Sequence, residues 1–143
     1  MAAIPITTDR LQQITAFLDG EPEVVFALLF GSRAAGTARP DSDYDVAVWL
    51  EPHLDDGQRH DWLRRAYAAL TPPDDVDLVV LNEAPALLGH RALMGRVLLK
   101  RDRAAYSRYF VKTIAMSNDE AHWRDLHDRA RRRRLEEGRF GRP

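Results

Sequence analysis

The sequence predicts an α/β (α+β) protein in which a mixed β-sheet carries helices packed on one face, with further helices at the C-terminal end. Three observations lead to this fold class. Apolar runs of strand length occur at 24–30, 45–50 and 76–81. Apolar residues at helical spacing lie before, between and after these runs. Strands that alternate with helices in this way favour a mixed sheet covered by helices.

The first elements are a helix and two strands. Thr8 and Asp9 are candidate N-caps for the helix, because their side chains accept hydrogen bonds from backbone N–H groups of a first turn. The apolar face of this helix has the expected spacing: Leu11, Ile14, Phe17 and Leu18. The wholly apolar run at 24–30 predicts a buried strand, and the run at 45–50 predicts a second one.

The remaining elements are expected in a fixed order: a helix at 58–70, a strand at 76–81, a helix from 85 to about 94, an edge strand at 96–99, and helices at 103–116 and 119–137. The polar residues at 117–120 supply the break and the cap between the last two helices. No linker is long enough to divide the chain. Residues 1–143 are therefore expected to form a single domain with a basic C-terminal helix at about 119–137.

Charge and composition exclude several classes of protein. The net charge of −1 gives no overall attraction to nucleic acid or to membranes, and direct nucleic acid binding is not expected. No cysteine is present, which excludes disulfides and thiolate metal sites. No apolar run approaches the length of a membrane span, and the N-terminus lacks the basic and apolar segments of a signal peptide. A cytoplasmic location is expected.

The C-terminal end is the basic part of the chain. Residues 124–143 include eight arginines and four acids, and Arg131 to Arg134 are consecutive. Trp123, Leu126 and Ala130 add an apolar stripe at helical spacing. The segment can be a solvated helix, a surface that docks on an acidic partner protein, or a surface for RNA. We favour docking on a partner.

The stretch from Gly31 to Asp45 carries the clearest chemistry. Gly31 and Ser32 follow a buried strand, where a tight turn into a helix directs backbone N–H groups toward a phosphate. Asp43 and Asp45 are two residues apart, so in an extended strand they project from one face. Two such carboxylates can bind cations that lie about 3.5–4 Å apart in two-metal sites. Together these features indicate a site for a nucleoside triphosphate.

Asp77 lies inside the apolar 76–81 strand. Burying an unpaired carboxylate costs several kcal/mol, so Asp77 is either exposed, paired or bound to a metal. If this strand lies beside the strand of Asp45, three carboxylates meet. Each pair would repel by about 1 kcal/mol at 4 Å in water, and by nearer ~4 kcal/mol at an effective dielectric constant of 20. Such a cluster suits a cation site, and oxygen ligands alone favour Mg²⁺ or Mn²⁺.

These residues resemble the DNA polymerase β-type nucleotidyltransferase superfamily, in which Gly-Ser precedes Asp-x-Asp by ten residues and a later strand carries a third aspartate. The segments PDSDYDVAV, VDLVVLNEAP and GRVLLKRD further resemble the minimal adenylyltransferase antitoxins (MntA-type) of HEPN–MNT toxin–antitoxin pairs. The resemblance covers about residues 28–102. It implies a nucleotidyltransferase fold, ATP as substrate, Mg²⁺ as cofactor and a HEPN ribonuclease toxin as partner.

The resemblance also implies roles for individual residues. Gly31 and Ser32 would hold the triphosphate, Asp43 and Asp45 would bind Mg²⁺, and Asp77 would help to deprotonate the attacking hydroxyl. Related proteins often carry an arginine where Ala35 stands here, which leaves Arg33 or Arg39 to neutralise phosphate charge. AMP would be transferred from ATP to a tyrosine of the toxin, which silences it.

Two other functions remain open from the sequence. A small-molecule nucleotidyltransferase would use the same site, although such enzymes usually carry an additional domain for the acceptor. A non-catalytic antitoxin would neutralise its toxin by occlusion and would keep only a vestigial site.

Overall fold

The computed structural model describes residues 6–136, without the side chains of residues 6–9, 73, 120–123, 125–127, 130 and 133–136. Its centre is a four-stranded sheet of order β3-β2-β1-β4. The strands are β1 (Val24–Phe30), β2 (Tyr44–Leu50), β3 (Val76–Val80) and β4 (Arg96–Lys100). β1 pairs antiparallel with β2 and β4, whereas β2 and β3 are parallel. The predicted mixed sheet is thus confirmed.

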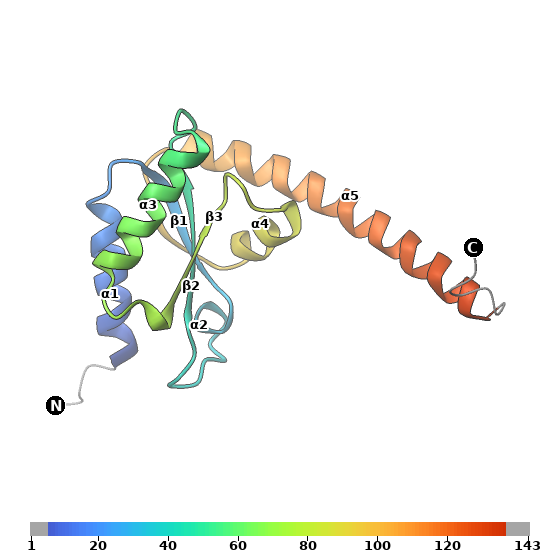
Figure 1. Cartoon of the computed structure of the whole chain (residues 1–143), viewed down its shortest axis with the longest axis horizontal. Helices are drawn as coiled ribbons and strands as arrows, with labels where there is room; N and C mark the ends of the chain where they lie inside the picture. The colour runs from blue at the N-terminus through green and yellow to red at the C-terminus, as the bar shows by residue number, and fades with distance from the viewer. Residues whose placement is uncertain (1–5, 137–143) are drawn as a thin grey trace.

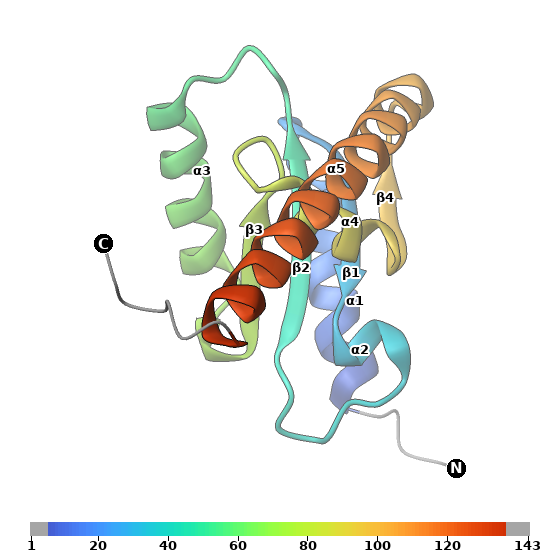
Figure 2. The ribbon, with the colours of Figure 1, turned by 90° about the vertical axis from the view of Figure 1, so that its right-hand side faces the viewer.

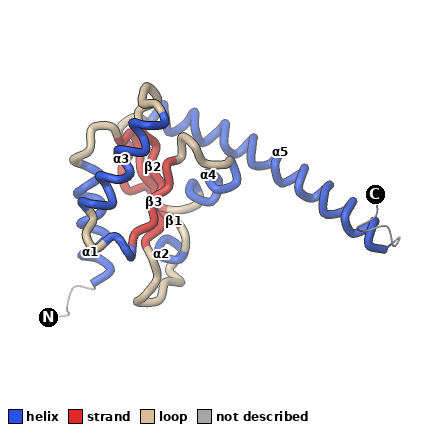
Figure 3. The backbone as a smooth tube through the Cα atoms, viewed as in Figure 1, coloured by secondary structure: helices blue, strands red, loops and turns tan. Residues whose placement is uncertain are grey.

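Helices cover both faces of this sheet (Figure 3). α1 (Ile6–Asp19) and α3 (Asp56–Ala69) pack on one face, through residues such as Ile14, Leu18 and Trp62. α4 (Ala86–Leu93) and the start of α5 (Arg103–Glu136) pack on the other face. The expectation that helices pack on one face is therefore wrong. All seven residues of β1 are buried, and a strand that is apolar on both sides needs cover on both sides.

The α1–α3 side of the sheet fixes the start of β3. The nearly buried guanidinium of Arg10 donates to Asp75 Oδ1 at 2.7 Å and to the carbonyl of Leu70 at 3.1 Å. A short 3₁₀ turn, η1 (Pro73–Asp75), leads directly into β3. α1 already includes Thr8 and Asp9, so the predicted N-cap is wrong. α3 instead has a capping box between Asp55 and Gln58.

α5 is one continuous helix of 34 residues, so the predicted break at 117–120 is wrong. Ser117 is buried, and its hydroxyl donates to the carbonyl of Ile114 at 3.0 Å while lying 2.9 Å from His90 Nδ1. A serine whose hydroxyl bonds back to the preceding turn remains compatible with a helix. The first part of α5 packs on the sheet and on α4, and the remainder projects away from it (Figure 1). No helix within residues 6–136 combines the length and apolarity of a membrane span.

Candidate active site

Gly31 forms the turn between β1 and the four-residue helix α2 (Ser32–Ala35). Its φ of 72° and ψ of −156° lie in a region that essentially only glycine adopts. A Cβ atom at this position would stand 2.2 Å from Asp45 Oδ2. Position 31 therefore requires glycine for two reasons: the backbone conformation, and the lack of space for a Cβ atom beside the Asp45 carboxylate. Ser32 follows at the start of α2 and is partly exposed.

Asp45 lies in β2 with a neighbour on each side: Phe30 of β1 and Asp77 of β3. Directly paired residues project from the same face of a sheet, so Asp45 and Asp77 share the face that α4 and α5 cover. Burial raises the pKa of the Asp45 carboxyl, and the charges of Asp77 and Asp43 raise it further. The charge of Arg91 opposes this shift.

The other two carboxylates are exposed to solvent. Asp43 lies in the loop just before β2, and Asp77 is the exposed second residue of β3, which is an edge strand of the sheet. Because β2 and β3 are adjacent and parallel, the fold brings Asp43, Asp45 and Asp77 to one end of the sheet. The condition set out from the sequence, that the strand of Asp77 lies beside the strand of Asp45, is therefore met.

The donor set suits a hard divalent cation. After burial, repulsion from Asp77 and Asp43 contributes to the raised pKa of Asp45, and a bound cation would relieve that repulsion. Among the described residues, however, no group of three or more His, Cys, Asp or Glu side chains is arranged to hold a metal ion by itself. Mg²⁺ is commonly held by one or two carboxylates together with substrate phosphates, and Asp43 and Asp45 fit that pattern.

The side chain of Arg33 contacts other residues of the protein. Its guanidinium donates to the carbonyl of Ser42 at 2.7 Å and lies 4.4 Å from the centre of the Tyr44 ring. These contacts hold the loop that carries Asp43. A direct role of Arg33 in nucleotide binding stays a prediction. Arg39, the other arginine considered from the sequence, is exposed in the same loop.

Arg91 is the residue that the sequence did not suggest. It lies on α4, far along the chain from Gly31 and Asp45, and no motif marks it. Its side chain is exposed, and its charge acts on Asp45. Only the fold brings it to the carboxylates.

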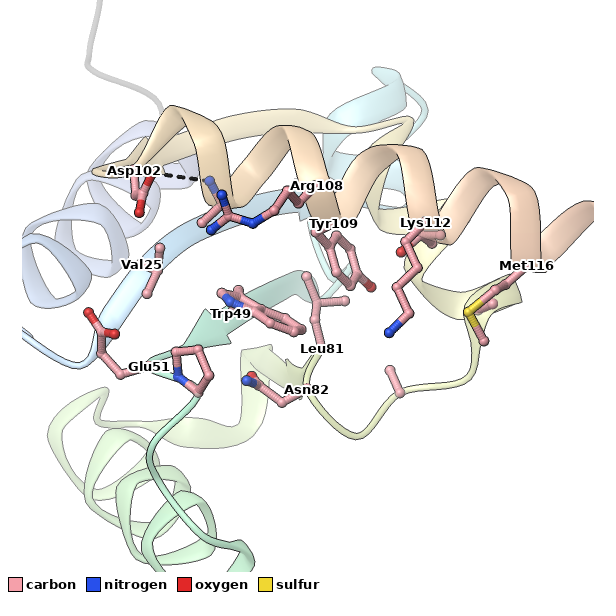
Figure 4. A pocket seen from close by; sticks show the side chains of 15 residues that line it. Val25, Trp49, Glu51, Leu81, Asn82, Asp102, Arg108, Tyr109, Lys112 and Met116 are labelled. Atoms are coloured by element: carbon pink, nitrogen blue, oxygen red, sulfur yellow. Dashed lines mark hydrogen bonds between the residues drawn. The ribbon is translucent and has the colours of Figure 1, made fainter.

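A separate cavity of about 500 Å³ lies on the same sheet face as Asp45 but at the opposite end of β2 (Figure 4). Trp49 contributes to its floor, and Arg108, Tyr109 and Lys112 line it from α5. Trp49 packs against Tyr109 with ring centres 5.0 Å apart. The cavity does not include Asp43, Asp45 or Asp77, so it is distinct from the carboxylate site.

A glycine turn at the end of a buried strand, next to carboxylates on two parallel strands, is the arrangement that the sequence predicts for a nucleotidyltransferase site. Residues 12–104 match the model of the family described as Polymerase beta, Nucleotidyltransferase, and the chain belongs to this family. Protein adenylyltransferase MntA of Shewanella oneidensis is 33% identical over 98 residues, which span 68% of this chain and 69% of that protein.

Crystal structures of toxin–antitoxin complexes contain similar chains. A chain of a toxin–antitoxin complex with AMP-PNP is 27% identical, with a TM-score of 0.63 over 87% of this chain and 98% of that one. A second similar chain comes from the complex of tri-AMPylated Shewanella oneidensis HEPN toxin with MNT antitoxin. It is 26% identical, with a TM-score of 0.60 over 87% of this chain and 98% of that one. The predicted nucleotidyltransferase fold is confirmed.

Proposed function

We propose that this protein is an antitoxin that transfers AMP from ATP to a tyrosine hydroxyl of a HEPN ribonuclease toxin and thereby neutralises it. The observation that carries the proposal is the close fit of the Asp45 carboxylate against the backbone of Gly31, at the end of the sheet shared with Asp43 and Asp77. The similarity to MntA, and to chains from complexes with HEPN toxin, supports a protein acceptor.

The chemistry divides among few residues. The attacking hydroxyl oxygen forms a bond to the α-phosphorus, the bond from that phosphorus to the α–β bridging oxygen breaks, and pyrophosphate leaves with the electron pair. Backbone N–H groups at Gly31 and Ser32 would hold phosphate oxygens. Asp77, exposed on β3, would accept the proton of the hydroxyl. Mg²⁺ bound by Asp43 and Asp45 would neutralise charge on the phosphates.

The projecting part of α5 would hold the partner. Beyond Ser117 this helix leaves the sheet, and its described side chains are exposed and include the basic residues Arg124, Arg131 and Arg132. Such a helix face suits an acidic surface on another protein. The apolar stripe of Trp123, Leu126 and Ala130 lies outside the described side chains, as do Arg133 and Arg134. Unchanged affinity for the toxin after Arg131 to Arg134 are neutralised would refute this role.

The test is intact mass spectrometry of the neighbouring gene's product after co-expression. With the wild-type protein we expect one or more added AMP units, and with Asp43→Asn none. Asp41→Asn is the matched control, because Asp41 is an exposed aspartate of the same loop that is not expected to bind metal. A partner that co-purifies unmodified would support neutralisation by occlusion instead. Modification of a small alcohol in place of a protein would point to the small-molecule enzyme.

A further inference from the structure

A bound triphosphate is strongly anionic, and guanidinium groups of the protein can pair with its oxygens. In α2, position 35 is an alanine, and the arginine of this helix is Arg33. The guanidinium of Arg33 is engaged by the carbonyls of Pro40 and Ser42. Arg39 lies in the exposed loop before β2. α4 carries a further arginine, Arg91.

α4 brings Arg91 to the site. Ala92 and Leu93, which follow Arg91, pack in the same apolar cluster as Phe30, and Phe30 is the direct neighbour of Asp45 in the sheet. The end of α4 also approaches β1 closely, because a Cβ atom at Gly95 would stand 2.0 Å from the carbonyl oxygen of Leu29. Arg91 is thus carried on a helix that abuts the strand leading into Gly31.

The position of α4 is fixed from its other side by α5. A Cβ atom at Gly89 would stand 2.2 Å from the Tyr109 hydroxyl, so helix and ring are in close contact. His90 Nδ1 lies 2.9 Å from Ser117 Oγ. α4 therefore sits between the sheet and α5 (Figure 2), and the backbone of Arg91 has little freedom.

The guanidinium of Arg91 remains available. Its side chain is exposed, and within residues 6–136 it forms no hydrogen bond or ion pair with a described side chain. An arginine on a packed helix, whose guanidinium forms no hydrogen bond with a described side chain, is suited to phosphate, since guanidinium pairs with phosphate through parallel hydrogen bonds.

We propose that Arg91 binds the β- and γ-phosphates of the nucleotide and stabilises the departing pyrophosphate. The proposal rests on the proposed function, because it assumes that Gly31, Asp43 and Asp45 bind a nucleoside triphosphate. Arg91 would supply this positive charge from α4. This role predicts that Arg91 contacts the outer phosphates of the nucleotide and contacts neither the adenosine nor the acceptor.

The experiment measures dissociation constants for ATP, AMP and pyrophosphate by calorimetry with Mg²⁺ and without the toxin. We expect Arg91→Gln to weaken ATP and pyrophosphate about tenfold, as for one lost charged contact, and to change AMP less than about twofold. Arg91→Lys should recover part of the loss. Arg96→Gln is the matched control: Arg96 is an exposed arginine of β4 that lies next to Leu11 and Thr15 of α1, on the opposite face of the sheet.

The outcomes separate the two proposals. Wild-type protein that binds ATP, together with Arg91→Gln that binds it equally well, would overturn the role of Arg91 and leave the proposed function in place. Equal weakening of ATP and AMP would also overturn it, because the contact would then not be with the outer phosphates. Wild-type protein that binds no ATP would overturn both proposals.

Discussion

Asp45 Oδ2 occupies the space that a side chain at Gly31 would need, since a Cβ atom there would stand 2.2 Å from this oxygen. The carboxylate of β2 and the backbone turn after β1 are thus fitted to each other. A ligand bound to the N–H groups of this turn would lie next to the Asp45 carboxylate. The contact between Gly31 and Asp45 thus places the glycine turn directly beside the carboxylates.

Gly31→Ala should lower the free energy of unfolding by at least about 3 kcal/mol, because it combines a disfavoured backbone conformation with a steric clash. Gly36→Ala is the control: its φ is 78°, and nothing lies within 4 Å of a Cβ atom there. It should cost only about 1 kcal/mol. Urea denaturation gives both values. In an Asp45→Ala background the cost of Gly31→Ala should fall, and an unchanged cost would mean that the clash contributes nothing.

Asp45→Asn should raise the free energy of unfolding in metal-free buffer at neutral pH. The pKa of Asp45 is raised in the folded state above its ordinary value of 3.8, so the ionised carboxylate opposes folding. The wild-type protein should recover this stability as the pH falls through the raised pKa, and the difference from Asn should vanish below about the ordinary value. Denaturation curves across this range test the sign. A large loss of stability with Asn would make Asp45 a structural hydrogen-bonding residue.

Mg²⁺ together with ATP should raise the melting temperature, because a ligand at about one hundred times its dissociation constant stabilises the native state by about 2.7 kcal/mol. Removing the metal with a chelator should abolish most of the rise. Asp43→Asn should also abolish it, while leaving the melting temperature without ligand unchanged or higher, since Asp43 is exposed. Thermal denaturation followed by circular dichroism measures both effects. A full shift in Asp43→Asn would exclude Asp43 as a metal ligand.

Ser117→Ala should destabilise the protein by about 1 kcal/mol, because it removes the buried hydroxyl that lies next to His90. Ser107→Ala is the matched control, as Ser107 is exposed on the same helix. Chemical denaturation compares the two. Equal stability of both variants would show that the contact between α4 and α5 does not depend on this hydrogen bond.

The sequence predicted the strands well because their apolar runs are long and bounded by polar turns. It misplaced the end of a helix at Ser117, where a residue type favoured at caps instead bonds to Ile114 and His90 inside a helix. Likewise the spacing of Gly31, Ser32, Asp43 and Asp45 pointed to one site, since these residues lie on consecutive elements. Arg91 could not be found in this way, because its proximity to Asp45 depends on how α4 packs against the sheet.

The paired neighbours of Asp45 have a consequence for amide hydrogen exchange. β2 is bonded to a strand on each side, so amides near Asp45 can exchange only when the centre of the sheet opens, whereas Asp43 lies in an exposed loop outside the sheet. The amide of Asp45 is therefore expected among the slowest to exchange, and that of Asp43 among the faster ones. The effect of nucleotide binding on amide exchange should therefore be concentrated at residues 36–43.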